Sequence, residues 1–408
     1  MKKWLSVLTV LSLWGCQAVT DGNEGADTSS IDSIESTESV ESVESIESVD
    51  EVESEEEPEE PVETRVSFVG VGDNLIHDSI YISAEQVDGS YDFKPMYEHV
   101  AEDIANADLA FLNQETILAG PDYPLSGYPS FNTPDDIAQN MVDLGFDLIN
   151  GATNHTLDYD YPGAIHAINV WKQFDEIIFA GAYLDEEARN TVQTIEREGV
   201  TFSLLAYTYG TNGIQPDTDW RVAYFDEDKI RQDIAQAKEV SDVVIVSAHW
   251  GDENTPVLNE MQQYYAQLFA DLEVDVVIGT HPHILQTIEW LTGENGNEML
   301  VVYSLGNFLA HSLEDFNTLG GIISFDFVIT DEETKVENVL FQPTVIHYTA
   351  KREDIVNTRR DFKIYKLPQF TDDLAATHAL NGYNGIQISR DNYQAIVNDI
   401  IPAEFLEE

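Results

Sequence analysis

The chain has 408 residues, with 76 Asp and Glu against 19 Lys and Arg, and its formal net charge at pH 7 is −57. From Arg65 onward, 17 basic residues stand against 58 acidic ones, so the predicted folded part alone carries −41. A surface this acidic repels phosphate groups, which excludes nucleic acid as a partner. An anionic substrate would therefore need a local positive centre, such as a bound metal.

The first sixteen residues have the pattern of an export signal. Lys2 and Lys3 precede an apolar run over residues 4–14, which is too short to span a bilayer as a stable helix. Leu13-Trp14-Gly15-Cys16 resembles a bacterial lipobox, which predicts a lipid on Cys16 and a place at the extracellular face of the membrane. An ordinary signal peptide with an incidental cysteine, or an uncleaved anchor, is the alternative. Cys16 is the only cysteine, so the folded part has no disulfide and no thiolate ligand.

Residues 17–64 form a repetitive acidic segment, with 18 Asp and Glu and no Lys or Arg. Glu and Ser recur with a period near three, and large apolar side chains are scarce. Self-repelling charge leaves little apolar burial to offset the entropy of ordering. We expect a disordered, extended tether between a membrane and a folded domain, with polymer binding by the acidic repeat as the alternative.

From Arg65 onward, apolar runs alternate with amphipathic helical stretches. Strands are predicted at residues 66–72, 109–112, 146–150, 177–180, 200–207, 243–247, 274–278, 284–291, 300–304 and 321–329. Helices are predicted at residues 96–105, 136–144, 163–174, 229–240, 260–272 and 392–401. Strands that alternate with helices indicate βαβ units and a largely parallel sheet, and the later run of strands indicates a second sheet packed beside it. The predicted class is α/β.

Six predicted strands run directly into polar side chains. These are Asp73, Glu115, Asn154 with His155, His249, His281 with His283, and Asn307. Taken singly, an Asp or Asn after a strand is commonly a helix cap or turn residue, and His249 could be a core histidine. Taken together, they follow the rule that ligands bind at the carboxyl ends of strands in open α/β sheets. We expect them to converge in space.

The residue types point to metal chemistry. Two carboxylates, an amide oxygen and three imidazoles form a mixed oxygen and nitrogen set that suits Mn, Fe or Zn, as one ion or a pair. Glu115 is placed to bridge two ions. A metal pair can lower the pKa of a bound water toward ~7 and clamp the attacking and leaving oxygens. His77, four residues after Asp73, is expected to line the pocket and contact substrate.

The order and spacing of six motifs resemble the CapA family of poly-γ-glutamate capsule biosynthesis proteins, which is related to calcineurin-like metallophosphoesterases. The motifs are Gly72-Asp73, Asn113-Gln114-Glu115-Thr116, Thr153-Asn154-His155-Thr156-Leu157-Asp158, His249-Trp250-Gly251-Asp252-Glu253, Gly279-Thr280-His281-Pro282-His283 and Tyr303-Ser304-Leu305-Gly306-Asn307-Phe308. The resemblance implies a four-layer α/β/β/α sandwich of the metallophosphoesterase type. The resemblance covers residues 66–329, and we expect a domain over residues 65–350 with a C-terminal extension over 351–408 packed on it.

The resemblance also implies roles for single residues. Asp73 and His283 would hold a first metal, Glu115 would bridge, and Asn154, His249 and His281 would complete a second site. His155 would protonate the leaving group, since imidazole serves as acid or base near neutral pH, and Asp158 would orient it. Asn113, Glu253 and Asn307 are expected to contact substrate.

Two departures from the phosphoesterases weaken the first metal site. Their first motif is Asp-x-His, but this chain has Asp73-Asn74-Leu75, and Glu115 stands where they keep a bridging Asp. A single-metal centre or a different reaction therefore stays open. We expect a surface-anchored protein of poly-γ-glutamate capsule synthesis, export or anchoring with a metal-dependent hydrolase-like or transferase-like site, working beside capsule synthase components. The alternatives are a non-catalytic component that binds poly-γ-glutamate or another anionic surface polymer, and a secreted metallophosphatase.

Overall fold

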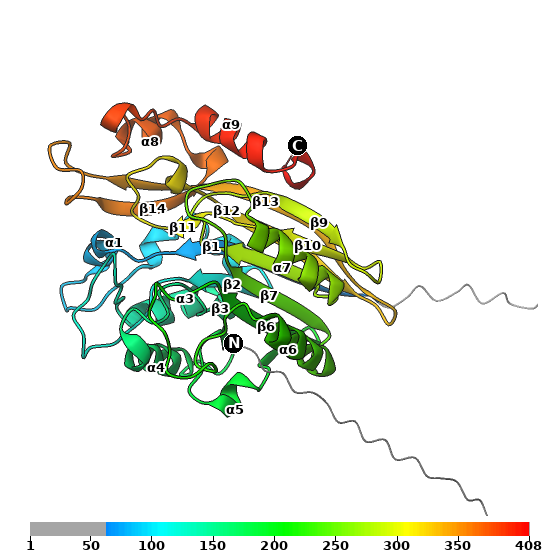
Figure 1. Ribbon diagram of the computed structural model, residues 1–408. Helices are drawn as coiled ribbons and strands as arrows, with labels where there is room; N and C mark the ends of the chain where they lie inside the picture. Colours follow the sequence, from blue (N-terminus) through cyan, green and yellow to red (C-terminus); the bar gives the residue numbers. More distant parts are fainter. Residues whose placement is uncertain (1–62, 408) are drawn as a thin grey trace, which may run out of the picture. The chain divides into compact units, whose positions relative to one another are not determined.

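The computed structural model describes residues 63–407, and the predicted signal segment, Cys16 and nearly all of the acidic tether lie outside them. Two β-sheets form the centre of this part of the chain (Figure 1). The first has eight strands, in the order β14-β13-β12-β1-β2-β3-β4 with β11 beside β1. These are β1 (Thr64–Asn74), β2 (Leu109–Gln114), β3 (Leu148–Asn150), β4 (Ile178–Ala180), β11 (Asn307–Leu309), β12 (Leu319–Ile329), β13 (Thr334–Thr349) and β14 (Arg360–Lys366).

The second sheet has six strands, in the order β5-β6-β7-β8-β10-β9. They are β5 (Thr194–Arg197), β6 (Val200–Thr208), β7 (Val243–His249), β8 (Val276–Thr280), β9 (Ile288–Thr292) and β10 (Glu298–Val302). Strands β6, β7, β8 and β10 are parallel, and the edge strands β5 and β9 are antiparallel to their neighbours. The predicted parallel core is therefore present in both sheets, since β1 to β4 are parallel as well.

Helices cover the outer sides of the two sheets. They are α1 (Asp78–Ala84), α2 (Ala101–Ala105), α3 (Asp136–Leu144), α4 (Asp160–Trp171), α5 (Glu186–Arg189), α6 (Glu227–Val240), α7 (Glu260–Asp271), α8 (Asp372–Thr377) and α9 (Arg390–Ile400). Helices α6 and α7 pack on the second sheet, and α8 and α9 lie above β13 and β14 (Figure 1). The described residues thus form the α/β/β/α sandwich that the family resemblance implies. None of their helices is long and apolar enough to cross a membrane.

Alternation along the strands builds the core on both faces of the second sheet. In β7, Val243 and Ile245 belong to the core between the sheets, whereas Val244 and Val246 belong to the core under α6 and α7. This is the period of two that sends successive strand side chains to opposite faces. Between the sheets, the ring centroids of Phe202 and Phe327 are 5.3 Å apart.

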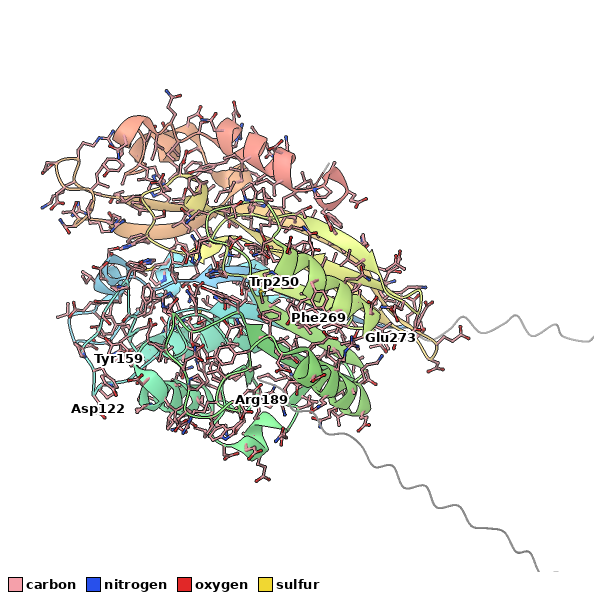
Figure 2. The ribbon with its side chains drawn as sticks, viewed as in Figure 1. Asp122, Tyr159, Arg189, Trp250, Phe269 and Glu273 are labelled. Carbon is pink, nitrogen blue, oxygen red and sulfur yellow. The ribbon has the colours of Figure 1, made fainter. Side chains whose placement is uncertain are left out.

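The core under α7 is rich in aromatic side chains. Trp250 follows β7 and Phe269 lies on α7, and their ring centroids are 6.5 Å apart (Figure 2). The indole Nε1 of Trp250 donates a hydrogen bond of 3.1 Å to the backbone oxygen of Tyr303, after β10. Both rings are fully buried, and the hydrogen bond ties the end of β7 to the end of β10 where these strands leave the sheet.

The last strands take a different place from the one predicted. Residues 321–329 were expected in the second sheet, but β12 returns to the first sheet and pairs antiparallel with β1 from Thr64↔Ile329 to Val71↔Ile322. The cause is β11, which crosses from β10 to run parallel beside the end of β1, with Asn307 opposite Asp73. This crossing joins the two sheets at the edge where the polar residues gather.

Candidate metal centre

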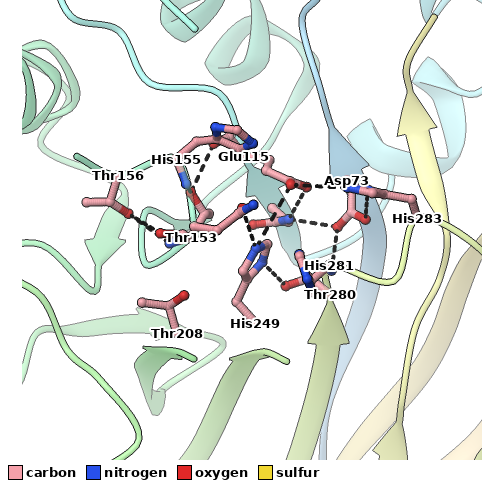
Figure 3. A network of polar contacts seen from close by, with 12 residues as sticks. Asp73, Glu115, Thr153, His155, Thr156, Thr208, His249, Thr280, His281 and His283 are labelled. Carbon is pink, nitrogen blue, oxygen red and sulfur yellow. Dashed lines mark hydrogen bonds and ion pairs between the residues drawn. The ribbon is translucent and has the colours of Figure 1, made fainter. Parts of the chain in front are cut away.

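Strands from both sheets end at one place. In the first sheet, the register sets Asp73 opposite both Asn113 and Asn307. In the second sheet, His249 at the end of β7 lies opposite Thr280 at the end of β8. The structure brings together Asp73, Glu115, Asn154, His155, His249, His281 and His283 (Figure 3).

Asp73 is buried and held from both sides. Its Oδ1 accepts hydrogen bonds from Nδ2 of Asn113 at 2.7 Å and from the backbone N–H of His281 at 3.2 Å. Its Oδ2 lies 3.0 Å from Nδ1 of His283. His281 and His283 both have left-handed backbone conformations, with φ of 99° and 61°. Such conformations are costly for residues other than glycine, and here they turn the loop back onto Asp73.

Glu115 and two histidines form a group with the geometry of a metal site. The ligand atoms of Glu115, His281 and His283 lie within 4.8 Å of one another. Oε1 of Glu115 is 3.5 Å from Nε2 of His283 and 4.0 Å from Nε2 of His249. Within residues 63–407, neither this Oε1 nor Nδ1 of His281 has a hydrogen-bond partner, although both atoms are buried. An orphaned buried polar atom costs about 1–3 kcal/mol, so the donor set fits a divalent cation that would satisfy both.

His249 is fixed at both ring nitrogens. Nδ1 lies 2.9 Å from the hydroxyl of Thr280, and Nε2 lies 3.0 Å from Oδ1 of Asn154. This pair of contacts sets the plane of the imidazole, with Nε2 facing the amide oxygen of Asn154 and lying 4.0 Å from Oε1 of Glu115. A ring oriented by a hydrogen bond on its far nitrogen is the usual arrangement for a metal-ligating histidine.

Burial and charge divide the histidines into two kinds. Burial lowers the pKa of His249 and of His281 well below the usual range, so both rings stay neutral and keep a lone pair for a metal. Burial also works to lower the pKa of His283, but the carboxylates of Glu115 and Asp73 outweigh it and raise that pKa to about 10. Burial raises the pKa of Glu115 well above its usual range. A divalent cation would supply the positive charge that these carboxylates otherwise obtain from His283.

His155 lies beside this group and is positioned by an acid. Its Nδ1 is 2.7 Å from Oδ2 of Asp158, and that same Oδ2 accepts the backbone N–H of Phe131 at 2.7 Å. The ring of Phe131 meets the imidazole edge-on, with centroids 4.7 Å apart. Nδ1 is therefore held by Asp158, which leaves Nε2 as the nitrogen that can serve a substrate.

The residues expected to contact substrate take different positions. Asn113 is fully buried, and its amide is used inside the protein, donating to Asp73 and accepting from Asn150 at 2.7 Å. The structure therefore places Asn113 as a positioning residue for Asp73 instead of a substrate contact. Asn307 is buried too, and its Oδ1 lacks a partner within residues 63–407. Glu253 is exposed, and its charge helps to raise the pKa of Glu115.

His77 packs in a group of rings next to the centre. It is buried, its ring stacks on His311 with centroids 3.8 Å apart, and it meets Phe131 edge-on at 5.2 Å. Burial lowers the pKa of His77 to about 3, so the ring is neutral at physiological pH. Its Nδ1 lies 2.9 Å from the backbone oxygen of Leu75. The expected substrate contact by His77 stays a prediction.

Sequence reasoning missed Tyr209 and His311. The ring of Tyr209 lies 4.6 Å from that of His281 and is 42% exposed, so it borders the centre on the solvent side. Burial and the charge of Glu253 raise the pKa of Tyr209 to about 12. Tyr209 comes directly after β6, so the strand-end pattern could have found it. His311 follows the short strand β11 and carried no comparable signal.

The chain matches a known family across the whole of this constellation. The family is described as Bacterial capsule synthesis protein PGA_cap, and the match runs over residues 67–312. The chain belongs to this family. The matched range includes Asp73 at its start and Asn307 near its end, and with it every residue of the candidate centre. The family resemblance inferred from the six motifs is confirmed.

Two curated capsule proteins are similar to this chain. PGA biosynthesis protein CapA of Bacillus subtilis (strain 168) is 31% identical over 172 residues, which are 41% of this chain and 44% of that protein. Capsule biosynthesis protein CapA of Bacillus anthracis is 26% identical over 182 residues, which are 43% of each. The match therefore spans less than half the length of either relative.

Solved structures with a related arrangement include two phosphoesterases. A phosphatase of Mycoplasma pneumoniae is 13% identical, with 70% of this chain and 95% of that chain covered and a TM-score of 0.43. The calcineurin-like phosphoesterase YfkN of Bacillus subtilis is also 13% identical, with 69% and 91% covered and a TM-score of 0.42. The fold assignment of this PGA_cap family member stands on its own two sheets and helical layers.

Proposed function

We propose that this PGA_cap family member is a metal-dependent enzyme of capsule assembly that hydrolyses or transfers the γ-glutamyl amide bonds of an anionic surface polymer. The observation that carries the proposal is the pairing of two features in one place. Glu115, His281 and His283 offer ligand atoms within 4.8 Å of one another, and beside them Asp158 holds His155 at 2.7 Å. A site that only bound polymer would have no use for a positioned acid.

Each part of the centre has a distinct task. Glu115, His249, His281, His283, Asp73 and Asn154 are the residues that would hold divalent metal, which when bound supplies Lewis acidity and a water with its pKa lowered toward ~7. Asn113 and Thr280 keep Asp73 and His249 in position through hydrogen bonds of 2.7 and 2.9 Å. In hydrolysis the amide C–N bond breaks, a carboxylate forms on one fragment and the amine leaves on the other.

His155 is the residue that would protonate the departing amine. An amide nitrogen is a poor leaving group until it is protonated, and Nε2 of His155 would deliver the proton. Asp158 accepts from Nδ1, fixes the tautomer and stabilises the imidazolium, and the N–H of Phe131 keeps Asp158 itself in place. The edge contact with Phe131 limits rotation of the ring.

Removal of metal tests the proposal directly. We expect purified protein to contain about one or two equivalents of a divalent metal, measured by inductively coupled plasma mass spectrometry. It should shorten poly-γ-glutamate, measured by size-exclusion chromatography. Dialysis against a chelator should abolish shortening, and Mn, Fe or Zn added back should restore it. Shortening that persists in chelated, metal-free protein contradicts the proposal, and so does metal-loaded protein that leaves the polymer intact.

We further propose that the protein is held at the outer face of the membrane through Cys16. The sequence Leu13-Trp14-Gly15-Cys16 and the acidic segment after it support this. Cys16→Ser removes the residue that would carry the lipid, so the protein should move from the membrane fraction to the culture medium. Fractionation and immunoblot measure this. Ser6→Ala, a change within the apolar run, is the control. Retention of Cys16→Ser in the membrane, as an uncleaved helix, would contradict lipid anchoring.

A further inference from the structure

Basic side chains are concentrated in one short segment of this acidic chain. Of the 17 Lys and Arg from Arg65 onward, six lie in residues 351–366, against three acidic residues. They are Lys351, Arg352, Arg359, Arg360, Lys363 and Lys366. The segment is the loop from β13 into β14 together with β14 itself. A local excess of positive charge in a protein of this net charge marks a place where an anion can approach.

The segment lines a cleft. The cleft has a volume of about 630 Å³ and lies between α1 and the β13–β14 hairpin, with α1 beside β14 (Figure 1). Its charged lining consists of Lys351, Arg359, Arg360, Lys363, Asp92 and Asp361. Lys363 pairs with Glu98, and Arg360 pairs with Asp361 at 3.5 Å with both side chains more than half exposed. Within residues 63–407, Lys351 and Arg359 have no ion-pair partner.

Arg359 is the unusual member of this group. Its side chain is only 8% exposed, and its guanidinium donates to two backbone oxygens, those of His311 at 2.9 Å and Val356 at 3.0 Å. Its Nε is buried and has no partner among residues 63–407. A buried cation without a counter-charge is costly, and burial lowers the pKa of this guanidinium. The charge of Asp78 reaches this guanidinium and works to raise its pKa, but no carboxylate among residues 63–407 forms an ion pair with it. An external anion can therefore pair with Arg359.

A chain of contacts links the cleft to the candidate centre. Nη2 of Arg359 is 3.4 Å from Nε2 of His311, whose ring stacks on His77 at 3.8 Å. His77 immediately precedes α1 and shares Phe131 with His155. Helix α1 begins at the residue after His77 and lines the cleft with Ile82 and Ser83. The same short helix therefore borders the cleft and leads to the group of rings beside His155.

We propose that the cleft between α1 and the β13–β14 hairpin binds carboxylates of an anionic polymer whose chain continues into the metal centre. This inference rests on the proposed function for its substrate class. The basic rim attracts the polymer, and Arg359 pairs with one carboxylate in the desolvated part of the cleft. An acidic protein thereby holds a like-charged polymer in register with His155.

Binding and turnover are measured separately to test this. The probe is a fluorescent γ-linked glutamate oligomer of about ten residues, followed by anisotropy at two salt concentrations. Lys351→Gln/Arg360→Gln removes two exposed charges from the cleft and should weaken binding about tenfold or more, with a smaller salt dependence. The matched control is Lys229→Gln/Arg231→Gln, which removes two exposed charges on α6 and should bind as wild type. Arg359→Lys keeps the charge, loses the fork of donors and should bind more weakly than wild type.

Two further oligomers test which chemical group the cleft binds. The same oligomer with its carboxylates amidated should not bind, and a glycerol phosphate oligomer should bind more weakly than the carboxylate oligomer. Equal binding by wild type and the cleft variant overturns the inference. It is also overturned if the α6 control loses as much affinity for the oligomer as the cleft variant does. Tighter binding of the phosphate oligomer overturns the assignment to carboxylates. If wild type binds through the cleft yet never shortens the polymer, the proposed function fails while the cleft assignment stands.

Discussion

Replacing His281 by alanine is expected to remove most of the stabilisation that metal gives to this protein. A ligand at 100 times its dissociation constant stabilises the folded state by about 2.7 kcal/mol. His281 brings a buried Nδ1 with no hydrogen-bond partner in residues 63–407, and on this ground we propose it as a direct ligand. Its loss should weaken metal affinity about 100-fold or more, which leaves roughly 0.4 kcal/mol at the same metal concentration. Urea unfolding with and without metal measures both values.

The matched control for His281 is His166→Ala. His166 lies on α4 and pairs with Asp135 at 2.8 Å, and its side chain is 32% exposed. Because it is remote from the strand ends, its variant should keep the full stabilisation by metal. If His281→Ala retains the wild-type gain in stability, His281 is no ligand and the group formed with Glu115 and His283 does not hold the ion.

The strand-end residues could be predicted because each follows directly after an apolar run that is typical of a buried strand. Val274, Val276 and Ile278 are buried in and beside β8, and the polar residues begin where that apolar run stops. The carboxyl ends of parallel strands share an edge within a sheet, so Asp73 could be placed near Glu115, and His249 near His283, without knowledge of any side chain's direction. The fold class followed from the same alternation of strands and helices.

Other features depend on contacts that no local pattern encodes. The use of Asn113 to hold Asp73 depends on the register of β1 against β2 and on the amide of Asn150. Strand β13 begins with a half-exposed stretch whose charged side chains hide the strand pattern. In β14, Phe362 and Ile364 alternate with polar residues and are buried, but basic neighbours on both sides mask the signal. The cleft at this hairpin needs α1, nearly 300 positions earlier in the sequence, so only the folded chain reveals it.

Replacing His155 by alanine should greatly slow turnover while leaving metal binding intact. A positioned general acid contributes about 10²–10⁴-fold to rate, and His155 is the imidazole that Asp158 holds without any role as a ligand. We expect kcat for polymer shortening to fall by about that factor, with metal content by mass spectrometry and oligomer binding unchanged.

Asp158→Asn tests whether Asp158 acts on catalysis through His155 or only supports the fold. It keeps the shape of the side chain but removes the negative charge beside Nδ1 of His155, so turnover should fall, but by less than in His155→Ala. A general loss of folding would instead lower metal content in both variants. If His155→Ala shortens the polymer at the wild-type rate with its metal in place, proton delivery comes from elsewhere. The hydrogen bond between His155 and Asp158 then only supports the loop after β3.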